Sequence, residues 1–108
     1  MIVTLTQRKK ARVDQIRQGI ERLKVELAGY ARVNNGRFWL YGSAASGDVR
    51  YDSDADILVD FEPAALSAAT TFAEDTCVRF GLKPDIKPKS WCKDEFLRRI
   101  APTALVLS

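Results

Sequence analysis

The sequence contains no histidine and only two cysteines among its 108 residues. Without histidine, the chain has no Ser-His-Asp or Cys-His catalytic arrangement, no histidine zinc ligand and no histidine pH switch. Any catalysis must therefore rest on carboxylates, hydroxyl groups, lysines or a bound metal ion. Cys77 and Cys92 have neither the spacing of a metal site nor the density of a secreted disulfide scaffold, so we expect a reduced, cytoplasmic protein.

Long hydrophobic runs are also missing. No apolar run approaches the roughly 18 residues that suggest a membrane span. Arg8, Lys9 and Lys10 interrupt the start of the chain before a signal sequence develops. We therefore expect no membrane association. The length is that of one domain, and a hydrophobic share of 46% excludes a disordered tail.

Basic residues outnumber acidic ones by 17 to 14, and the two kinds are unevenly spread. Residues 1–30 carry seven basic and three acidic groups, residues 31–62 carry three and six, and residues 63–108 carry seven and five. An acidic segment between basic ones suits a site where a cation is held for an anionic ligand, although such blocks can also be solvated faces. A uniformly basic chain would instead suggest nucleic acid, which we do not expect as the primary ligand.

The first predicted element is an amphipathic helix over about residues 6–30, because apolar residues recur there in steps of three and four. These residues are Val13, Ile16, Ile20, Leu23, Leu27 and Tyr30. Asn34-Asn35-Gly36 then breaks the chain, and the aromatic run Phe38–Tyr41 predicts a buried strand.

Strands and helices alternate along the rest of the chain, which predicts an α/β or α+β fold without linkers or internal repeats. Turn residues and helix caps give the expected bounds. The predicted order is a short helix capped by Ser43, a strand over 54–61, a helix from Pro63 to Gly81, a strand over 82–87, a helix capped by Ser90 and a strand over 104–107.

Two carboxylates stand out in the second predicted strand. Because strand side chains alternate between faces, Asp54 and Asp56 project to one side. Ala55, Ile57 and Val59 then point into the core. Neighbouring carboxylates repel each other unless a cation or hydrogen-bond donors lie between them. Mg²⁺ accepts such a pair and completes its octahedron with water and substrate phosphates.

Asp85, in the third predicted strand, is the candidate for a third carboxylate if the two strands are neighbours. Three carboxylates could hold two Mg²⁺ ions about 4 Å apart, one on a triphosphate and one lowering the pKa of an attacking hydroxyl. Gly42 and Ser43 supply the other half of the predicted site. Glycine lets a phosphate approach the backbone, and the serine hydroxyl adds a donor at a helix start. This turn is neither a Walker loop nor a G-x-G-x-x-G fingerprint.

Two simpler interpretations of these residues are weaker. The acidic run Asp52–Asp56 does not begin an EF-hand loop, because Ile57 and Pro63 occupy the positions that require glycine and glutamate. The turn and the aspartates could also be purely structural. That interpretation leaves the order of strand, Gly-Ser turn and two acidic strands as a coincidence.

The segment Leu40-Tyr41-Gly42-Ser43, followed after ten residues by Asp54-x-Asp56, resembles the signature of the minimal nucleotidyltransferases, small relatives of the DNA polymerase beta superfamily. The resemblance implies a polymerase-beta-like core, a small mixed β-sheet with flanking helices, over about residues 37–108 of a single domain, 1–108. It also implies residue roles. Gly42 and Ser43 would bind the nucleotide phosphates, and the catalytic, Mg²⁺-binding residues would be Asp54, Asp56 and Asp85.

Many bacterial members are similar to the antitoxin half of HEPN/MNT toxin–antitoxin pairs, which transfers AMP from ATP to a tyrosine of the cognate HEPN toxin. The resemblance thus implies a protein adenylyltransferase with ATP as substrate and a small HEPN-type toxin as partner. Members of this group often have an arginine or lysine where this chain has Ser46. The basic residue that meets the triphosphate is left open among Arg50, Lys83, Lys87 and Lys89.

Two other functions stay open at this point. The chain could be a binding module, weak or inactive as a catalyst, that neutralises a partner by docking. It could also transfer a nucleotide to a small-molecule or RNA hydroxyl. The base preference and the oligomeric state are open as well, and Trp39 or Trp91 could line an interface between copies.

Overall fold

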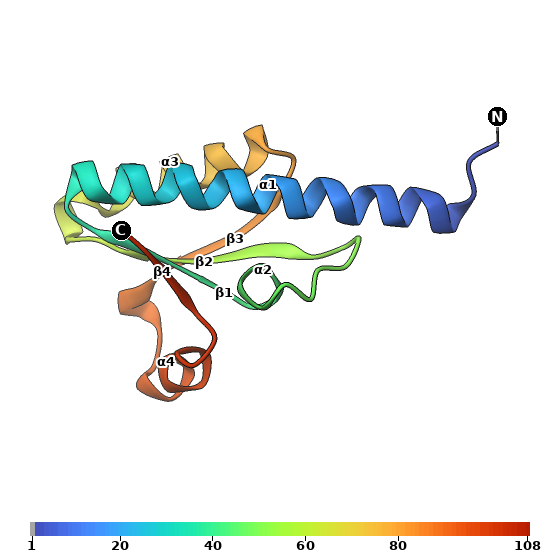
Figure 1. Ribbon diagram of the computed structural model, residues 1–108. Coiled ribbons are helices and arrows are strands. Elements are labelled where there is room, and N and C mark those ends of the chain that lie inside the picture. Colours follow the sequence, from blue (N-terminus) through green and yellow to red (C-terminus); the bar gives the residue numbers. More distant parts are fainter. Residues whose placement is uncertain (1) are drawn as a thin grey trace.

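Helices and strands alternate through residues 2–108, the part of the chain that the computed structural model describes (Figure 1). The helices are α1 (Leu5–Asn34), α2 (Ser43–Ser46), α3 (Pro63–Arg79) and α4 (Asp94–Ile100), with a 3₁₀ turn, η1 (Lys89–Trp91), before α4. The strands are β1 (Arg37–Tyr41), β2 (Asp54–Asp60), β3 (Lys83–Pro88) and β4 (Leu105–Leu107). The predicted α/β class is confirmed.

The four strands form one mixed sheet in the order β3-β2-β1-β4. β1 is antiparallel to both of its neighbours, whereas β2 and β3 are parallel and α3 connects them. A parallel pair needs such a crossover, and α3 buries its apolar side in making it. Ala69, Ala73 and Cys77 on this helix are fully buried. The second and third strands are therefore neighbours, which is the condition on which Asp85 joins the other two aspartates.

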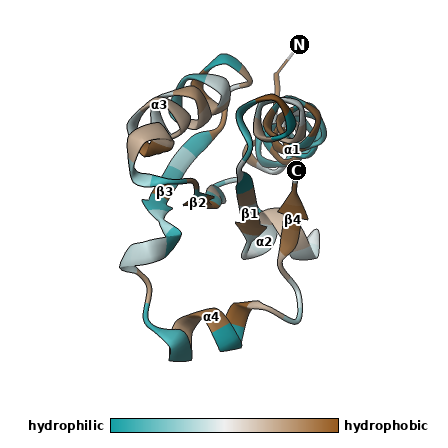
Figure 2. Cartoon of the chain, turned by 90° about the vertical axis from the view of Figure 1, so that its left-hand side faces the viewer, coloured by the Kyte–Doolittle hydropathy of each residue, from teal (hydrophilic) through white to brown (hydrophobic). Residues whose placement is uncertain are grey.

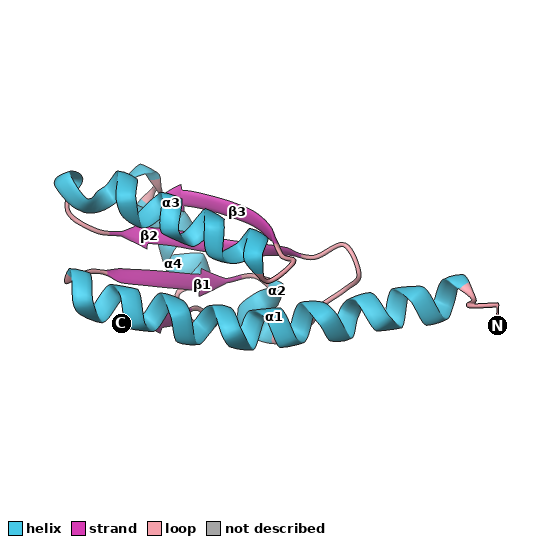
Figure 3. Ribbon diagram, turned by 90° about the horizontal axis from the view of Figure 1, so that it is seen from above, coloured by secondary structure: helices cyan, strands magenta, loops and turns pink. Residues whose placement is uncertain are grey.

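Helix α1 is longer than the predicted 6–30. Thr4 caps it, since the side chain of Thr4 accepts from the Gln7 amide while the Gln7 side chain accepts from the Thr4 amide. The helix continues to Asn34, because Asn35 (φ 60°) is the first residue in the left-handed conformation. Its buried residues begin only at Ile16, and the preceding turns extend beyond the sheet (Figure 3).

The two faces of the sheet differ in character. Ala55, Ile57 and Val59 of β2 are buried beneath α1 and α3, as predicted. An aromatic cluster lies at the end of this core, where the rings of Tyr30 and Phe72 stack with centroids 4.2 Å apart. The opposite face carries the polar residues of β2, and α4 lies beyond it, away from α1 and α3 (Figure 2).

Two predicted caps are wrong. Ser43 is the first residue of α2 rather than its N-cap, because Gly42 takes the capping position with a conformation that serine avoids. Ser90 does not begin the last helix. It lies in η1, which follows Pro88, and α4 starts only at Asp94, after Lys93.

The edges of the sheet are β3 and β4. β3 contains Pro84 and Pro88, residues that lack a backbone donor, whereas β4 exposes Leu105 and Val106. No helix within residues 2–108 is long and apolar enough to cross a membrane. The domain bounds 1–108 stay a prediction.

Candidate active site

The turn between β1 and α2 depends on a glycine. Gly42 has φ 66° and ψ −149°, a region that only glycine occupies at low cost. A Cβ atom at this position would overlap Oδ2 of Asp56. The amides of Ala45 and Ser46 donate to the Gly42 carbonyl, which leaves the amides of Ser43 and Ala44 as the donors at the start of α2. The turn thus presents donors directly next to a carboxylate.

Three strands bring one row of polar side chains together. Tyr41 of β1 pairs with Asp56 of β2, and Asp56 pairs with Asp85 of β3. Paired residues in adjacent strands share a face, so these three side chains lie side by side. Asp54 lies on the same face, two residues earlier, and its Oδ1 is 3.8 Å from Nζ of Lys83. The predicted placement of both carboxylates of β2 on one side is confirmed.

The carboxylates of Asp56 and Asp85 are neighbours across two paired strands. Burial raises the pKa of Asp56, and the neighbouring carboxylates of Asp85 and Asp54 raise it further. Lys87 acts in the opposite direction, and the resulting pKa of Asp56 is about 6, against an ordinary 3.8. Asp56 therefore favours a proton or a nearby cation over an unpaired charge.

The three carboxylates do not converge on a single point. Across residues 2–108, no group of three or more acidic or cysteine side chains is close enough to hold a metal ion. Asp56 and Asp85 still fit Mg²⁺ as a pair, because they are hard oxygen donors whose mutual repulsion a divalent cation would relieve. The roles predicted for Gly42, Ser43, Asp54, Asp56 and Asp85 as a nucleotide and metal site stay predictions.

A family model of the nucleotidyltransferase domain matches residues 13–103. The match begins within α1 and ends just before β4, so it includes the Gly-Ser turn and all three aspartates. The chain belongs to the nucleotidyltransferase domain family. A search of curated proteins found no match to the chain. The resemblance is confirmed at this level, and nucleotidyl transfer is the chemistry of the family.

Tyr41 and Lys87 lie in the same row of polar side chains. The two side chains are close enough for the charge of Lys87 to act on the Tyr41 hydroxyl. Burial raises the pKa of Tyr41, while Lys87 opposes that shift. Lys87 is one of the four basic residues that the sequence leaves open, and strand alternation favours it over Arg50, since it follows Asp85 by two residues and so shares its face. No local pattern indicates Tyr41, because its role depends on strand pairing.

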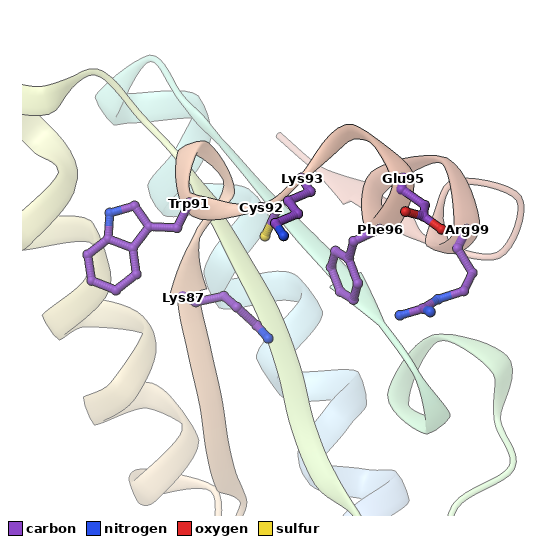
Figure 4. Close-up of a pocket in the computed structure, with 7 residues that line it drawn as sticks. All are labelled: Lys87, Trp91, Cys92, Lys93, Glu95, Phe96 and Arg99. Carbon is purple, nitrogen blue, oxygen red and sulfur yellow. The ribbon is translucent and has the colours of Figure 1, made fainter.

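A pocket of about 360 Å³ lies between β3 and α4 of the nucleotidyltransferase domain (Figure 4). Phe96 forms part of its wall, and the Phe96 ring meets the Tyr41 ring edge-on, with centroids 5.6 Å apart. The pocket therefore adjoins the row of polar side chains. Its lining residues are Lys87, Trp91, Cys92, Lys93, Glu95, Phe96 and Arg99.

Proposed function

We propose that this nucleotidyltransferase domain transfers AMP from ATP, in the presence of Mg²⁺, to a tyrosine hydroxyl of a partner HEPN toxin, and so acts as an antitoxin. The observation that carries the proposal is the strand pairing that sets Asp56 beside Asp85, with Asp56 in contact with the Gly42 turn. Nucleotidyl transfer needs one site for phosphate and one for cations, and these residues would supply both. The protein acceptor rests on the resemblance of the Gly-Ser and Asp-x-Asp motifs.

The chain's own residues divide into two groups in this reaction. Gly42 and Ser43 bind phosphate oxygens through backbone N–H groups and the serine hydroxyl. Asp54, Asp56 and Asp85 would hold Mg²⁺. The bound metal neutralises triphosphate charge and lowers the pKa of the attacking hydroxyl.

The transfer is an in-line displacement at the α-phosphorus of ATP. The tyrosine oxygen of the acceptor forms a bond to that phosphorus while the bond to the bridging oxygen breaks, and pyrophosphate leaves. The proton of the hydroxyl passes to water, because the carboxylates that would hold Mg²⁺ are then ligands rather than bases. No histidine is needed, in agreement with a sequence that has none.

Transfer of label from α-labelled ATP to the co-purified partner tests the proposal. With Mg²⁺, label should move to the partner and its intact mass should rise by one AMP. Asp54→Asn and Asp56→Asn should abolish transfer. Asp60→Asn is the matched control, since Asp60 lies on the same strand and face but is ion-paired with Lys89 at 3.9 Å. Transfer that both site variants leave unchanged would overturn the proposal.

One observation favours a second candidate, a binding module that neutralises its partner by docking. Within residues 2–108, the three aspartates form no ready metal cluster, and Lys83 already pairs with Asp54. If docking alone suffices, Asp54→Asn and Asp56→Asn should neutralise the partner fully. Loss of neutralisation in these variants, with binding intact, would exclude this candidate.

A further inference from the structure

The phosphate-facing turn carries no positive charge of its own. Residues 42–47 read Gly-Ser-Ala-Ala-Ser-Gly, without lysine or arginine. A nucleoside triphosphate brings several negative charges, and proteins usually meet them with charge-assisted hydrogen bonds from lysine or arginine. Those cations must therefore come from elements that pack beside the turn.

Two helices approach the turn. Arg17 of α1 donates to the Gly47 carbonyl at 3.0 Å, and Lys24 of α1 is ion-paired with Glu21 at 3.0 Å, so the cations on this side already have partners.

Helix α4 approaches the start of the turn. Tyr41 directly precedes Gly42, and the Tyr41 ring contacts the Phe96 ring of α4 at a centroid distance of 5.6 Å and an interplanar angle of 86°. Tyr41 is buried and Phe96 is half-buried, so their edge-on contact fixes the position of α4 relative to the end of β1. The pocket between β3 and α4 therefore lies one side chain away from the turn.

Two cations flank Phe96 in this pocket. Nζ of Lys87 and Cζ of Arg99 each lie 5.3 Å from the centre of its ring, so Lys87 reaches it from β3 and Arg99 from the same helix, α4 (Figure 4). Cation–π contacts of this kind orient a charge without neutralising it.

Neither cation has an anionic partner. Among residues 2–108, Lys87 and Arg99 form no ion pair, whereas Lys83 and Lys89 are 3.8 and 3.9 Å from Asp54 and Asp60. The charges of Lys87 and Arg99 are thus held in place and remain available to an anion. Figure 4 shows Lys87 and Arg99 on either side of the Phe96 ring, with Trp91 directed away from them.

We propose that Lys87 and Arg99 bind the β- and γ-phosphates of the nucleoside triphosphate, and that the pocket between β3 and α4 receives them. The inference rests on the proposed nucleotidyl transfer and adds the residues that neutralise the phosphates. When the bond to the α-phosphorus breaks, the released pyrophosphate carries additional negative charge, and these two cations stabilise it. A pocket of about 360 Å³ is in the size range of small-molecule sites.

Calorimetric titration with inorganic triphosphate and Mg²⁺ tests this assignment without the nucleoside. Arg99→Ala should weaken binding by roughly 10-fold or more, the usual effect of losing a hydrogen bond to a charged group. Arg98→Ala is the matched control, because Arg98 is an exposed neighbour on α4 that does not line the pocket. It removes the same charge and should change the affinity by no more than about twofold. Equal weakening by both substitutions would overturn the inference.

Lys87→Met provides a second variant, and its thermal unfolding is measured first because Lys87 also contacts Tyr41. Arg99 is exposed, so Arg99→Ala tests the inference even if the Lys87 variant unfolds. Arg99→Lys should restore only part of the affinity, since lysine cannot make a bidentate contact.

The outcomes separate this inference from the proposed function. Wild-type protein that binds neither ATP nor triphosphate would overturn both. Binding that Asp56→Asn abolishes, but that Arg98→Ala and Arg99→Ala affect equally, would overturn the inference alone. A short single-stranded RNA serves as the last arm. If Arg99→Ala weakens binding of RNA but not of triphosphate, the pocket serves an acceptor's phosphates and the nucleotide assignment is wrong.

Discussion

Gly42 and Asp56 are in such close contact that no side chain fits at position 42, since its Cβ would overlap Oδ2 of the carboxylate. One contact therefore positions both the turn proposed to bind phosphate and the carboxylate proposed to bind metal. Gly42 also has φ 66°, so a substitution would add backbone strain to the overlap. A change at this position should displace both halves of the site together.

Gly42→Ala should destabilise the protein by about 2 kcal/mol or more and abolish nucleotidyl transfer. Gly47→Ala is its control, because Gly47 also has a positive φ, 85°, but a Cβ there meets nothing within 4 Å. It should cost about 1 kcal/mol from left-handed strain alone and retain transfer. Urea unfolding and the label-transfer assay measure the two effects. If Gly42→Ala retained transfer, the overlap of its Cβ with Oδ2 of Asp56 would not disturb the site, and the prediction would be wrong.

Asp56 should make stability depend on pH in the absence of metal. The pKa of Asp56 is raised from 3.8 to about 6 in the folded state, so the folded state binds this proton more tightly than the unfolded state. The contribution of this group to the free energy of unfolding is then most favourable below pH 4 and is lost as the pH rises to about 6.

Asp56→Asn should remove that loss. The variant should unfold a few degrees above the metal-free wild type at pH 7, and the difference should disappear toward pH 4. Mg²⁺ should raise the unfolding temperature of the wild type but not of the variant. Calorimetric scans at several pH values measure these unfolding temperatures. A difference between variant and wild type that is the same at every pH would contradict the raised pKa of Asp56.

Two glycines of α1 should respond oppositely to alanine. A Cβ at Gly19 would lie 2.8 Å from the backbone oxygen of Phe80 and 3.0 Å from Leu82, whereas one at Gly29 meets nothing within 4 Å. Gly19→Ala should therefore cost about 1–2 kcal/mol by pushing α1 away from the end of α3. Gly29→Ala should gain about 0.5–1 kcal/mol from helix propensity. Denaturant titrations measure the free energy of unfolding of both variants. A change in the same direction in both would contradict the prediction.

The two thiols should differ in reactivity. Cys77 is fully buried, and burial, together with the charge of Glu74, raises the pKa of its thiol to about 12. Cys92 is only partly buried and lines the pocket beside α4. A thiol reagent at pH 8 should modify one cysteine in the native protein and two in denaturant. Rapid modification of both native thiols would show that the α3 core opens readily.

Local patterns were sufficient for part of the fold and site. The period of strand side chains placed Asp54 and Asp56 on one face, and the glycine and proline signals gave both ends of α3. Asp85 required more, because its position beside Asp56 depends on whether β2 and β3 are neighbours. The sequence leaves this as a condition, and the structure shows the two strands paired in parallel.

The remaining features depend on contacts between distant segments. Gly42 displaces Ser43 from the capping position because Asp56, 14 residues later, occupies the space of a side chain. The relation of Lys87 and Arg99 appears only once α4 crosses the open face of the sheet and Phe96 meets Tyr41. Neither spacing nor propensity describes such contacts.

The prolines of β3 also control how the sheet can grow. An edge strand accepts a new neighbour through its outward-facing amides, and Pro84 and Pro88 remove two such donors from the β3 edge. β4 carries no proline, and its residues Leu105 and Val106 are exposed. Strand addition from another chain, whether in a functional complex or in an aggregate, is thus directed to the β4 edge and away from the side of the sheet that holds Asp85.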